Sequence, residues 1–301
     1  MSARPVFDRF YTPPLPPVSR AVFSLWTRTP MFRLEHGPLL VHTLAVCLAK
    51  QHFAEVDFVT DAQGAHLAQT LGWEFSSLWN GFEGLDLRGY EHIWALGKLV
   101  TLSGQERPCI HVDGDVLLFK PLPEHLLRAR LVAQSPDLQT HYTGADMDRG
   151  FALCGLPRGD TAYNAGLLGG SAPALSRAFA WAGLELARAF HCSDLNGTTT
   201  SMLIEQYQLG VFAHRSGVPV TPLLPLSPKR AEITEAGYAH LAGANKRNPF
   251  YLARVEARLA RDFPAAHARF IEGWTRLMQG DQCGSSDPAT PTSSCPSTST
   301  P

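Results

Sequence analysis

The segment formed by Asp113, Gly114 and Asp115 has the clearest chemical consequence in this sequence. It lies between two apolar runs, residues 109–112 before it and residues 116–119 after it. Apolar runs of this kind are typical of buried parallel strands, which are apolar on both faces. Two carboxylates at the end of such a strand lose solvation and repel each other, so they need a compensating charge. A divalent cation supplies it, because hard cations prefer oxygen ligands and commonly bridge carboxylates to substrate phosphates. The segment therefore predicts a metal-dependent enzyme with a nucleotide-linked substrate.

The same segment has three other interpretations, as a tight turn, a calcium loop or a phosphatase motif. Asp and Gly are common in tight turns, but strong apolar runs flank this segment directly on both sides. An EF-hand loop starting at Asp113 would put Leu117 and Leu118 where a ligand and a glycine are needed, so that hypothesis fails. Haloacid-dehalogenase-type phosphatases also begin with a strand that ends in Asp-x-Asp, and Asp113 would be the nucleophile. They need a second acidic pair later in the chain, and Asp146 and Asp148 precede no suitable helix.

A glycine-rich segment follows at residues 163–170. Its three glycines would let the backbone approach a ligand closely. Asn164 in this segment offers both a donor and an acceptor for sugar hydroxyls. The spacing is not the GxGxxG fingerprint, which argues against a nicotinamide-dependent dehydrogenase. Because glycines between a strand and a helix usually just make a turn, the segment alone is a weak signal.

A third segment runs from His240 through Gly243 to Lys246. A neutral imidazole can complete a metal site begun by two carboxylates. Lys246 would be a compact, mobile cation that neutralises the charge of a diphosphate. A lone histidine more often belongs to the core or the surface, and a lone lysine is usually solvated. The segment gains weight only together with the two before it.

Strands and helices alternate in the first half of the sequence, which predicts an α/β fold with a mostly parallel sheet. The expected strands are residues 21–27, 55–61, 74–79 and 109–112, and the expected helices are residues 39–49, 62–71 and 91–104. The second half is less regular. Strands are expected at 130–134 and 150–153, and helices at 174–190 and 199–209. Between them we expect a glycine-rich segment that connects strand and helix at 161–170, and after them a loop at 238–248. Asn248 and Pro249 are expected to cap and begin a further helix, before a last helix that carries Phe270 and Trp274.

The composition fits one globular domain, since 45% of the 301 residues are hydrophobic and 18% are charged. We expect an extended proline-rich segment at residues 1–20, a single domain at 21–280 and a disordered tail rich in Ser, Thr and Pro at 281–301. The formal net charge of −1 gives no reason to expect a nucleic-acid partner. No run approaches the roughly 20 apolar residues that span a bilayer. The six cysteines form no CxxC pair and the start has no apolar signal core, so we expect a cytoplasmic protein.

The order of the three segments resembles glycosyltransferases of the nucleotide-diphospho-sugar, or GT-A, type. The likeness is above all to family 8, the glycogenin and galactosyltransferase-like group, and extends loosely from residue 21 to residue 246. It rests on an apolar strand that ends in DxD, a glycine-rich Asn-x-Gly segment and a complete HxxGxxK motif. Family 8 usually has Pro-Trp after the lysine, whereas Arg247 and Asn248 stand there in this chain. The resemblance implies a GT-A fold, in which helices flank a mostly parallel central sheet.

The resemblance also implies a role for each matching residue. The residues implied to hold Mn²⁺ or Mg²⁺ are Asp113, Asp115 and His240, those implied to contact the donor are Thr60, Asp61, Lys98, Gly114, Gly166, Gly243 and Lys246, and those implied to lie beside the sugar are Asn164, Glu205 and Gln206. Lys98 would face donor phosphate, and the alternative is an exposed helical lysine. Asp61 would hold uracil or ribose at the carboxyl edge of the sheet, and the alternative is a cap of the next helix. A carboxylate at Glu205 would stabilise developing oxocarbenium charge.

The predicted function is transfer of a sugar from a nucleotide-diphospho-sugar, for which we expect a UDP-sugar, to the hydroxyl of an acceptor. The acceptor would be a saccharide, a glycoconjugate or a protein, and the resemblance implies retention of the anomeric configuration. Two alternatives stay open. One is a catalytically silent protein that binds sugar nucleotides on the same fold, and the other is a haloacid-dehalogenase-like phosphatase that uses Asp113.

Overall fold

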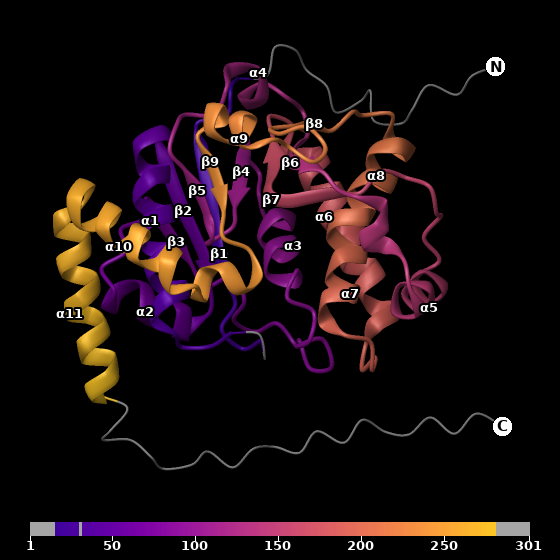
Figure 1. Ribbon diagram of the computed structural model, residues 1–301. Helices are drawn as coiled ribbons and strands as arrows, with labels where there is room; N and C mark the ends of the chain where they lie inside the picture. The colour runs from indigo at the N-terminus through magenta and orange to yellow at the C-terminus, as the bar shows by residue number, and fades with distance from the viewer. Residues whose placement is uncertain (1–15, 30–31, 281–301) are drawn as a thin grey trace.

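A seven-stranded sheet forms the centre of the protein in the computed structural model, which describes residues 16–29 and 32–280 (Figure 1). The strands lie in the order β3, β2, β1, β4, β7, β6, β8. Their bounds are β1 Arg20–Leu25, β2 Glu55–Thr60, β3 Ser77–Trp79, β4 Cys109–Val112, β6 Val132–Pro136, β7 Tyr163–Gly170 and β8 Thr221–Pro222. A second, two-stranded sheet pairs β5 (Val116–Leu118) with β9 (Tyr238–His240).

The directions of the strands confirm the predicted α/β class with a mostly parallel sheet. Strands β3, β2, β1 and β4 are parallel, and β8 is parallel to β6. Strand β7 is antiparallel to both of its neighbours, β4 and β6. Among the described strands of this sheet, β7 alone runs against the others. The carboxyl ends of β1, β4 and β6 therefore meet at one edge, beside the first residues of β7.

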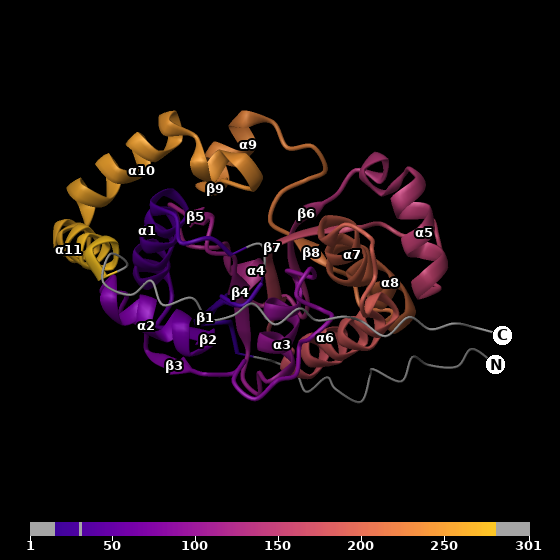
Figure 2. The same cartoon turned by 90° about the horizontal axis from the view of Figure 1, so that it is seen from below.

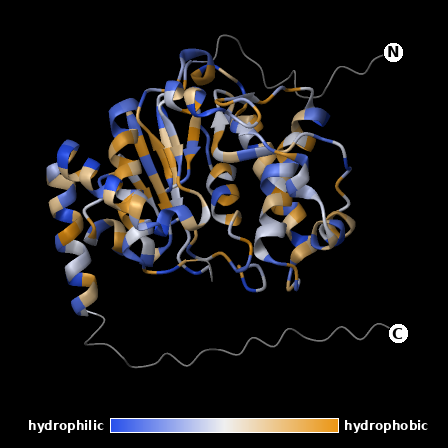
Figure 3. Ribbon diagram, viewed as in Figure 1, coloured by the Kyte–Doolittle hydropathy of each residue, from blue (hydrophilic) through white to orange (hydrophobic). Residues whose placement is uncertain are grey.

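Helices cover both faces of the sheet, and each face has its own apolar core (Figures 1 and 2). Within β1, Val22 belongs to one core and Phe23 to the other, as the alternation of strand side chains requires. Figure 3 shows apolar residues gathered on the strands between these helix layers. Helices α3 (Leu96–Ser103), α5 (Ala145–Cys154), α6 (Pro173–Ala187) and α8 (Gln208–Ser216) contribute to the first core, and helices α1 (His36–His52), α2 (Ala62–Thr70), α10 (Pro249–Asp262) and α11 (Pro264–Gly280) contribute to the second.

Short helical segments complete the described chain. They are α4 (Glu124–Leu127), η2 (Gln139–Tyr142), η3 (Arg188–Phe190), α7 (Gly197–Ser201), the π-helical turn η4 (Met202–Tyr207), α9 (Arg230–Ala236) and η5 (Gly243–Arg247). None of the helices in residues 16–29 and 32–280 has the length and apolar character needed to cross a lipid bilayer. The tail predicted at residues 281–301, and all but the last residues of the segment predicted at 1–20, lie outside the described part of the chain.

One predicted strand is wrong, because residues 150–153 lie in helix α5. Met147 and Phe151 are four residues apart and both buried, which is the spacing of a helix that packs on a core. The helix ends at Gly155, whose φ of 65° is the left-handed conformation that glycine favours at this position. The short apolar run at residues 150–153 thus fits the side-chain period of a strand as well as that of a helix. The glycine that follows it is typical of the end of a helix.

The glycine-rich segment and two neighbouring predictions also need correction. Residues 161–170 do not merely connect a strand to a helix but contain β7, a central strand. A Cβ on Gly169 would lie 2.3 Å from the carbonyl oxygen of Cys109, so this glycine lets β7 and β4 approach each other. The predicted loop at 238–248 begins with β9, and the predicted helix at 199–209 contains the π-helical turn η4.

The predicted start of α10 is confirmed. The side chain of Asn248 accepts a hydrogen bond from the backbone N of Phe250 at 3.0 Å, and Pro249 occupies the first turn. The helix predicted at residues 91–104 is shorter than expected and begins at Leu96. Helix α3 lines the site described next through Gly97 and Lys98.

Candidate active site

The two aspartates of the DxD motif lie directly after the carboxyl end of β4. The backbone N of Asp113 donates to the carbonyl of Gly166 at 3.0 Å, and the backbone N of Val116 donates to the carbonyl of Asp113 at 3.0 Å. The chain thus turns at once from β4 into β5. A Cβ on Gly114 would lie 2.2 Å from Nδ1 of His42, so the centre of the motif has room only for glycine. The turn places both carboxylates at the edge of the sheet where open α/β proteins bind ligands.

Strand β9 brings His240 to these carboxylates from a distant part of the sequence. His240 is the register partner of Val116, and the backbone N of Leu241 donates to the carbonyl of Asp115 at 2.9 Å. Nε2 of His240 lies 3.2 Å from Oδ1 of Asp115. One ligand atom from each of Asp113, Asp115 and His240 lies within 4.8 Å of the other two. The predicted approach of the histidine to both aspartates is confirmed, and two carboxylates with an imidazole suit a divalent cation.

Gln134 fixes the imidazole of His240. Its Oε1 accepts hydrogen bonds from the hydroxyl of Tyr238 at 2.6 Å and from Nδ1 of His240 at 2.9 Å. Because a carbonyl oxygen only accepts, Nδ1 carries a proton, and the lone pair of Nε2 is free to face Asp115. A lone pair and a carboxylate oxygen at 3.2 Å repel each other. A cation therefore belongs at this position, either a metal ion or a proton on Nε2.

Lys246 supplies a second positive charge to Asp115. Its Nζ lies 3.0 Å from Oδ2 of that carboxylate, and its side chain is 31% exposed. Burial alone would raise the pKa of Asp115, but the hydrogen bonds and charges of His240 and Lys246 hold it well below its usual range. The carboxylate is therefore ionised, and Lys246 keeps enough freedom to contact an anionic ligand.

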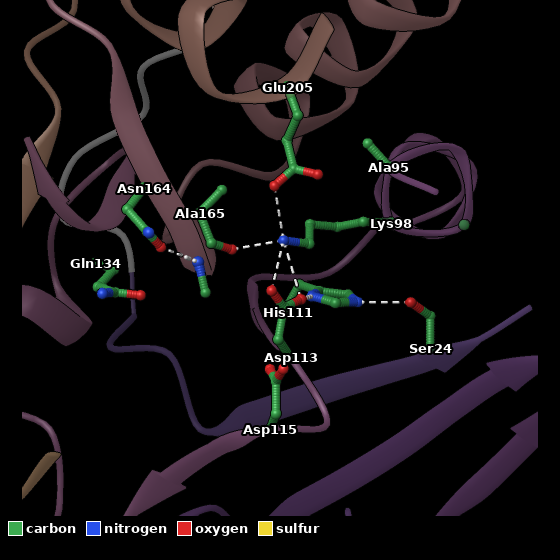
Figure 4. A network of polar contacts seen from close by, with 12 residues as sticks. Ser24, Ala95, Lys98, His111, Asp113, Asp115, Gln134, Asn164, Ala165 and Glu205 are labelled. Carbon is green, nitrogen blue, oxygen red and sulfur yellow. Dashed lines mark hydrogen bonds and ion pairs between the residues drawn. The ribbon is translucent and has the colours of Figure 1, made fainter. Parts of the chain in front are cut away.

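Lys98 joins Asp113 to Glu205 and is buried, so the alternative of an exposed helical lysine is wrong (Figure 4). Its Nζ lies 2.9 Å from Asp113, 2.8 Å from Oε1 of Glu205 and 2.6 Å from the carbonyl oxygen of Ala165. These contacts use all three donors of the ammonium group. Although burial opposes it, the charges of Asp113 and Glu205 raise the pKa of Lys98. The lysine is a fixed cation in the wall of the site.

The π-helical turn η4 turns the neighbouring residues Glu205 and Gln206 toward the same cavity. A π-helical turn inside a helix is rare and frequently occurs at functional sites. The side chain of Glu205 is 1% exposed, and its Oε2 has no hydrogen-bond partner among the described residues. Burial raises the pKa of this carboxyl to about 7, although the charge of Lys98 opposes the shift. The carboxyl thus has a buried oxygen whose hydrogen-bonding capacity is unused, which is rare for a buried polar group.

A cavity of about 540 Å³ connects these groups, which is within the roughly 300–1,000 Å³ of small-molecule sites. Most of the residues predicted from the sequence line it, and these are Lys98, Asp113, Gly114, Asp115, Asn164, Gly166, Glu205, Gln206, His240, Gly243 and Lys246. Oδ1 of Asn164 accepts from the backbone N of Gly166 at 3.1 Å, which leaves its amide nitrogen for a ligand. A Cβ on Gly166 would lie 2.4 Å from Oε1 of Gln134, so a larger residue there would displace the groups that hold His240.

Thr60 and Asp61 do not line this cavity. Oδ1 of Asp61 accepts from the backbone N of Gly64 at 2.9 Å, which caps helix α2, and the carboxylate also binds the backbone N and hydroxyl of Thr27 at 2.9 and 2.8 Å. The hydroxyl of Thr60 donates to the carbonyl of Leu25 at 2.6 Å. Both side chains are committed to the fold, so the geometry gives Asp61 the alternative capping role and does not support a contact with uracil or ribose.

Two histidines of the site were missed by the sequence analysis. The ring of His42 is stacked on Trp73 with centroids 4.2 Å apart and lines the cavity below the DxD turn. His111 lies on β4, where its Nε2 is 2.8 Å from the hydroxyl of Ser24 and its Nδ1 is 3.5 Å from Asp113. Residues 111 and 113 share one face of an extended chain, and this spacing of two was the signal for His111. His42 had no such signal, because its role depends on the packing of α1.

The sequence matches the model of DUF6734, described as a family of unknown function, over residues 32–273. No curated protein matches it. Among solved structures, the galactosyltransferase LgtC in complex with donor and acceptor sugar analogs is 15% identical, with a TM-score of 0.39 over 64% of this chain and 70% of that one. Mouse xyloside xylosyltransferase 1 in its apo form is 12% identical, with a TM-score of 0.43 over 69% of this chain and 86% of that one. Identities and TM-scores this low carry no conclusion about this chain, whose own residues must indicate its function.

Proposed function

This chain belongs to DUF6734, a family of unknown function, and we propose that it is a metal-dependent glycosyltransferase of the GT-A type. It moves a sugar from a nucleotide-diphospho-sugar to an acceptor hydroxyl, and the resemblance to family 8 implies a UDP-sugar as donor and retention of configuration. The observation that carries the proposal is the convergence of Asp113, Asp115 and His240 within 4.8 Å at one wall of a cavity. The three residues come from two motifs far apart in the sequence, and the order of those motifs is what resembles this class of enzyme.

The donor set fits Mn²⁺ or Mg²⁺. Nε2 of His240 and Oδ1 of Asp115 face each other at 3.2 Å, a contact that a metal ion or a proton on Nε2 satisfies, and Asp113 completes a set of oxygen and nitrogen ligands. When bound, such an ion acts as a Lewis acid toward the diphosphate of the donor. Lys246, which pairs with Asp115, would turn toward the diphosphate and stabilise the negative charge that develops as it leaves.

Two further residues that line the cavity support a sugar site. In residues 16–29 and 32–280, the amide nitrogen of Asn164 and Oε2 of Glu205 have no hydrogen-bond partner. These groups would bind sugar hydroxyls and orient the reacting carbon toward the acceptor. Lys98 holds Glu205 and Asp113 at a fixed distance from each other, so the sugar and the diphosphate are positioned by one rigid network.

Ligand-dependent thermal stabilisation tests the proposal. A panel of nucleotide-sugars is added with and without Mn²⁺, because a ligand at 100 times its Kd stabilises the native state by about 2.7 kcal/mol. We expect at least one UDP-sugar to raise the Tm only when Mn²⁺ is present. Asp115→Ala should abolish this shift, and Asp148→Ala should keep it, since Asp148 is an exposed aspartate of α5 paired with Arg158. The proposal is rejected if the Asp115→Ala protein keeps the Mn²⁺-dependent shift.

Turnover separates the two alternatives from the proposal. Release of UDP from the stabilising donor, measured in the presence of Mn²⁺, supports a transferase. A donor that binds but is never cleaved indicates a sugar-nucleotide-binding protein on the same fold. An aspartyl-phosphate trapped at Asp113 would instead establish the phosphatase.

A further inference from the structure

Tyr142 stands between a carboxylate and a carboxamide behind the cavity wall. Its side chain is buried, with its ring 5.4 Å from that of Tyr207. Its hydroxyl lies 3.0 Å from Oδ2 of Asp137 and 2.9 Å from Oε1 of Gln206. A phenol has one proton, so it cannot donate to both oxygens. In one of the two contacts the phenol oxygen must therefore accept a hydrogen bond instead of donating one.

The phenol of Tyr142 donates its hydrogen bond to the carboxylate of Asp137. Oδ1 of Asp137 already accepts from the backbone N of Leu138 and from Nδ1 of His141, each at 2.8 Å, and Oδ2 is left for Tyr142. An ionised carboxylate can only accept, and a charge-assisted hydrogen bond is stronger than a neutral one. The oxygen of Tyr142 must then accept from its other neighbour. A half-turn of the carboxamide of Gln206 puts its Nε2 in that position and satisfies all three groups.

We propose that Asp137 and Tyr142 are positioning residues that hold Gln206 with its carbonyl oxygen toward the cavity. Gln206 lines the cavity, whereas Asp137 and Tyr142 do not. With Nε2 bound to Tyr142, the opposite edge of the carboxamide presents Oε1 to the cavity that Gln206 lines. A carbonyl oxygen there accepts a hydrogen bond from a hydroxyl of the donor sugar and stabilises positive charge at its reacting carbon. The inference rests on the proposed function. It adds the two residues that determine which end of the Gln206 carboxamide faces the cavity.

Asp137→Asn tests the device without changing any group that lines the cavity. Oδ1 of the asparagine keeps the hydrogen bonds of Leu138 and His141, and its Nδ2 donates to Tyr142. The phenol then donates to Gln206, whose carboxamide turns and presents its nitrogen to the sugar. With UDP-glucose, UDP-galactose and Mn²⁺ as probes, we expect kcat for UDP release to fall about tenfold or more, since one misdirected group costs this much in comparable sites. The KM and the affinity for UDP should change less than about twofold, because the diphosphate site is intact.

A second substitution that restores kcat makes the test specific. A carboxylate accepts on both edges, so in Asp137→Asn with Gln206→Glu the phenol donates to one oxygen and the other faces the cavity. This double variant should recover most of the kcat that Asp137→Asn alone loses, which a merely structural defect would not allow. Tyr207→Phe is the matched control, because this neighbouring tyrosine accepts a hydrogen bond from the backbone N of Asp160 and none from Gln206. It should keep the wild-type kcat.

Three results would overturn the inference. They are a wild-type kcat in Asp137→Asn, a loss that Gln206→Glu does not reverse, or an equal loss in Tyr207→Phe. If Asp137→Asn folds poorly, Tyr142→Phe is compared in the wild-type and Gln206→Ala backgrounds, where additive losses would overturn the inference in the same way. A wild-type protein that binds no UDP-sugar with Mn²⁺ would instead reject the proposed function, so the two failures are distinct.

Discussion

The glycine at the centre of the DxD motif gives the sharpest test of the site's geometry. Gly114 does not have a positive φ, so its backbone conformation is open to alanine. The added Cβ, however, would lie 2.2 Å from Nδ1 and 2.8 Å from Cε1 of His42, which is far inside van der Waals contact. The imidazole cannot move aside, because it is buried and stacked on Trp73. We expect Gly114→Ala to cost about 1–3 kcal/mol of stability, the range for overpacking a core.

The same clash should displace both carboxylates and weaken Mn²⁺ binding. Urea unfolding measures the free energy, and titration of free Mn²⁺ by EPR measures the affinity. His42→Ala makes room for the methyl group, so the double variant should be more stable than the sum of the two single losses by about 1 kcal/mol or more. It should also bind Mn²⁺ more tightly than Gly114→Ala alone. A Gly114→Ala protein with wild-type stability and affinity would refute this description of the turn.

Two further predictions concern charge. Burial lowers the pKa of His42 from 6.5 to about 4. Between these pH values the imidazole is protonated in the unfolded chain and neutral in the folded protein. The free energy of unfolding should therefore fall by about 3 kcal/mol as pH drops from 6.5 to 4. His42→Gln should remove this part of the loss when urea unfolding is followed across that range in EDTA, and parallel curves for both proteins would contradict the prediction. Lys246→Ala should weaken UDP binding about tenfold or more and uridine binding less than twofold, as measured calorimetrically. Equal losses for the two ligands, or a similar effect of Lys229→Ala outside the cavity, would remove Lys246 from the diphosphate site.

The sequence predicted those site residues that belong to short motifs. An apolar strand ending in two carboxylates identified Asp113 and Asp115, and the HxxGxxK spacing identified His240 and Lys246. Their approach was a hypothesis from resemblance, and the pairing of β5 with β9 supplies its physical cause. The alternation of strands and helices likewise predicted the parallel half of the sheet.

Other parts depend on tertiary contacts that no local pattern records. The burial of Lys98 follows from two carboxylates, one directly after β4 and one in η4, and Gln134 acts on His240 only because β9 brings the imidazole to the side chain of this β6 residue. Asp61 had two interpretations from its position at the end of a parallel strand, a ligand contact or a helix cap, and its carboxylate caps helix α2. The end of a strand predicts where a residue lies in the fold. The role of that residue follows only from the groups that its side chain contacts.

The proposal stands on a single cation shared by an imidazole and two carboxylates. Pulsed EPR of the Mn²⁺-loaded protein measures this directly, because a coordinated imidazole nitrogen couples magnetically to the ion. We predict a nitrogen coupling in the wild-type protein that is lost in His240→Gln, while His267→Gln, which changes a histidine of α11, keeps it. A wild-type spectrum without nitrogen coupling, or a coupling that survives in His240→Gln, would contradict the proposed metal site.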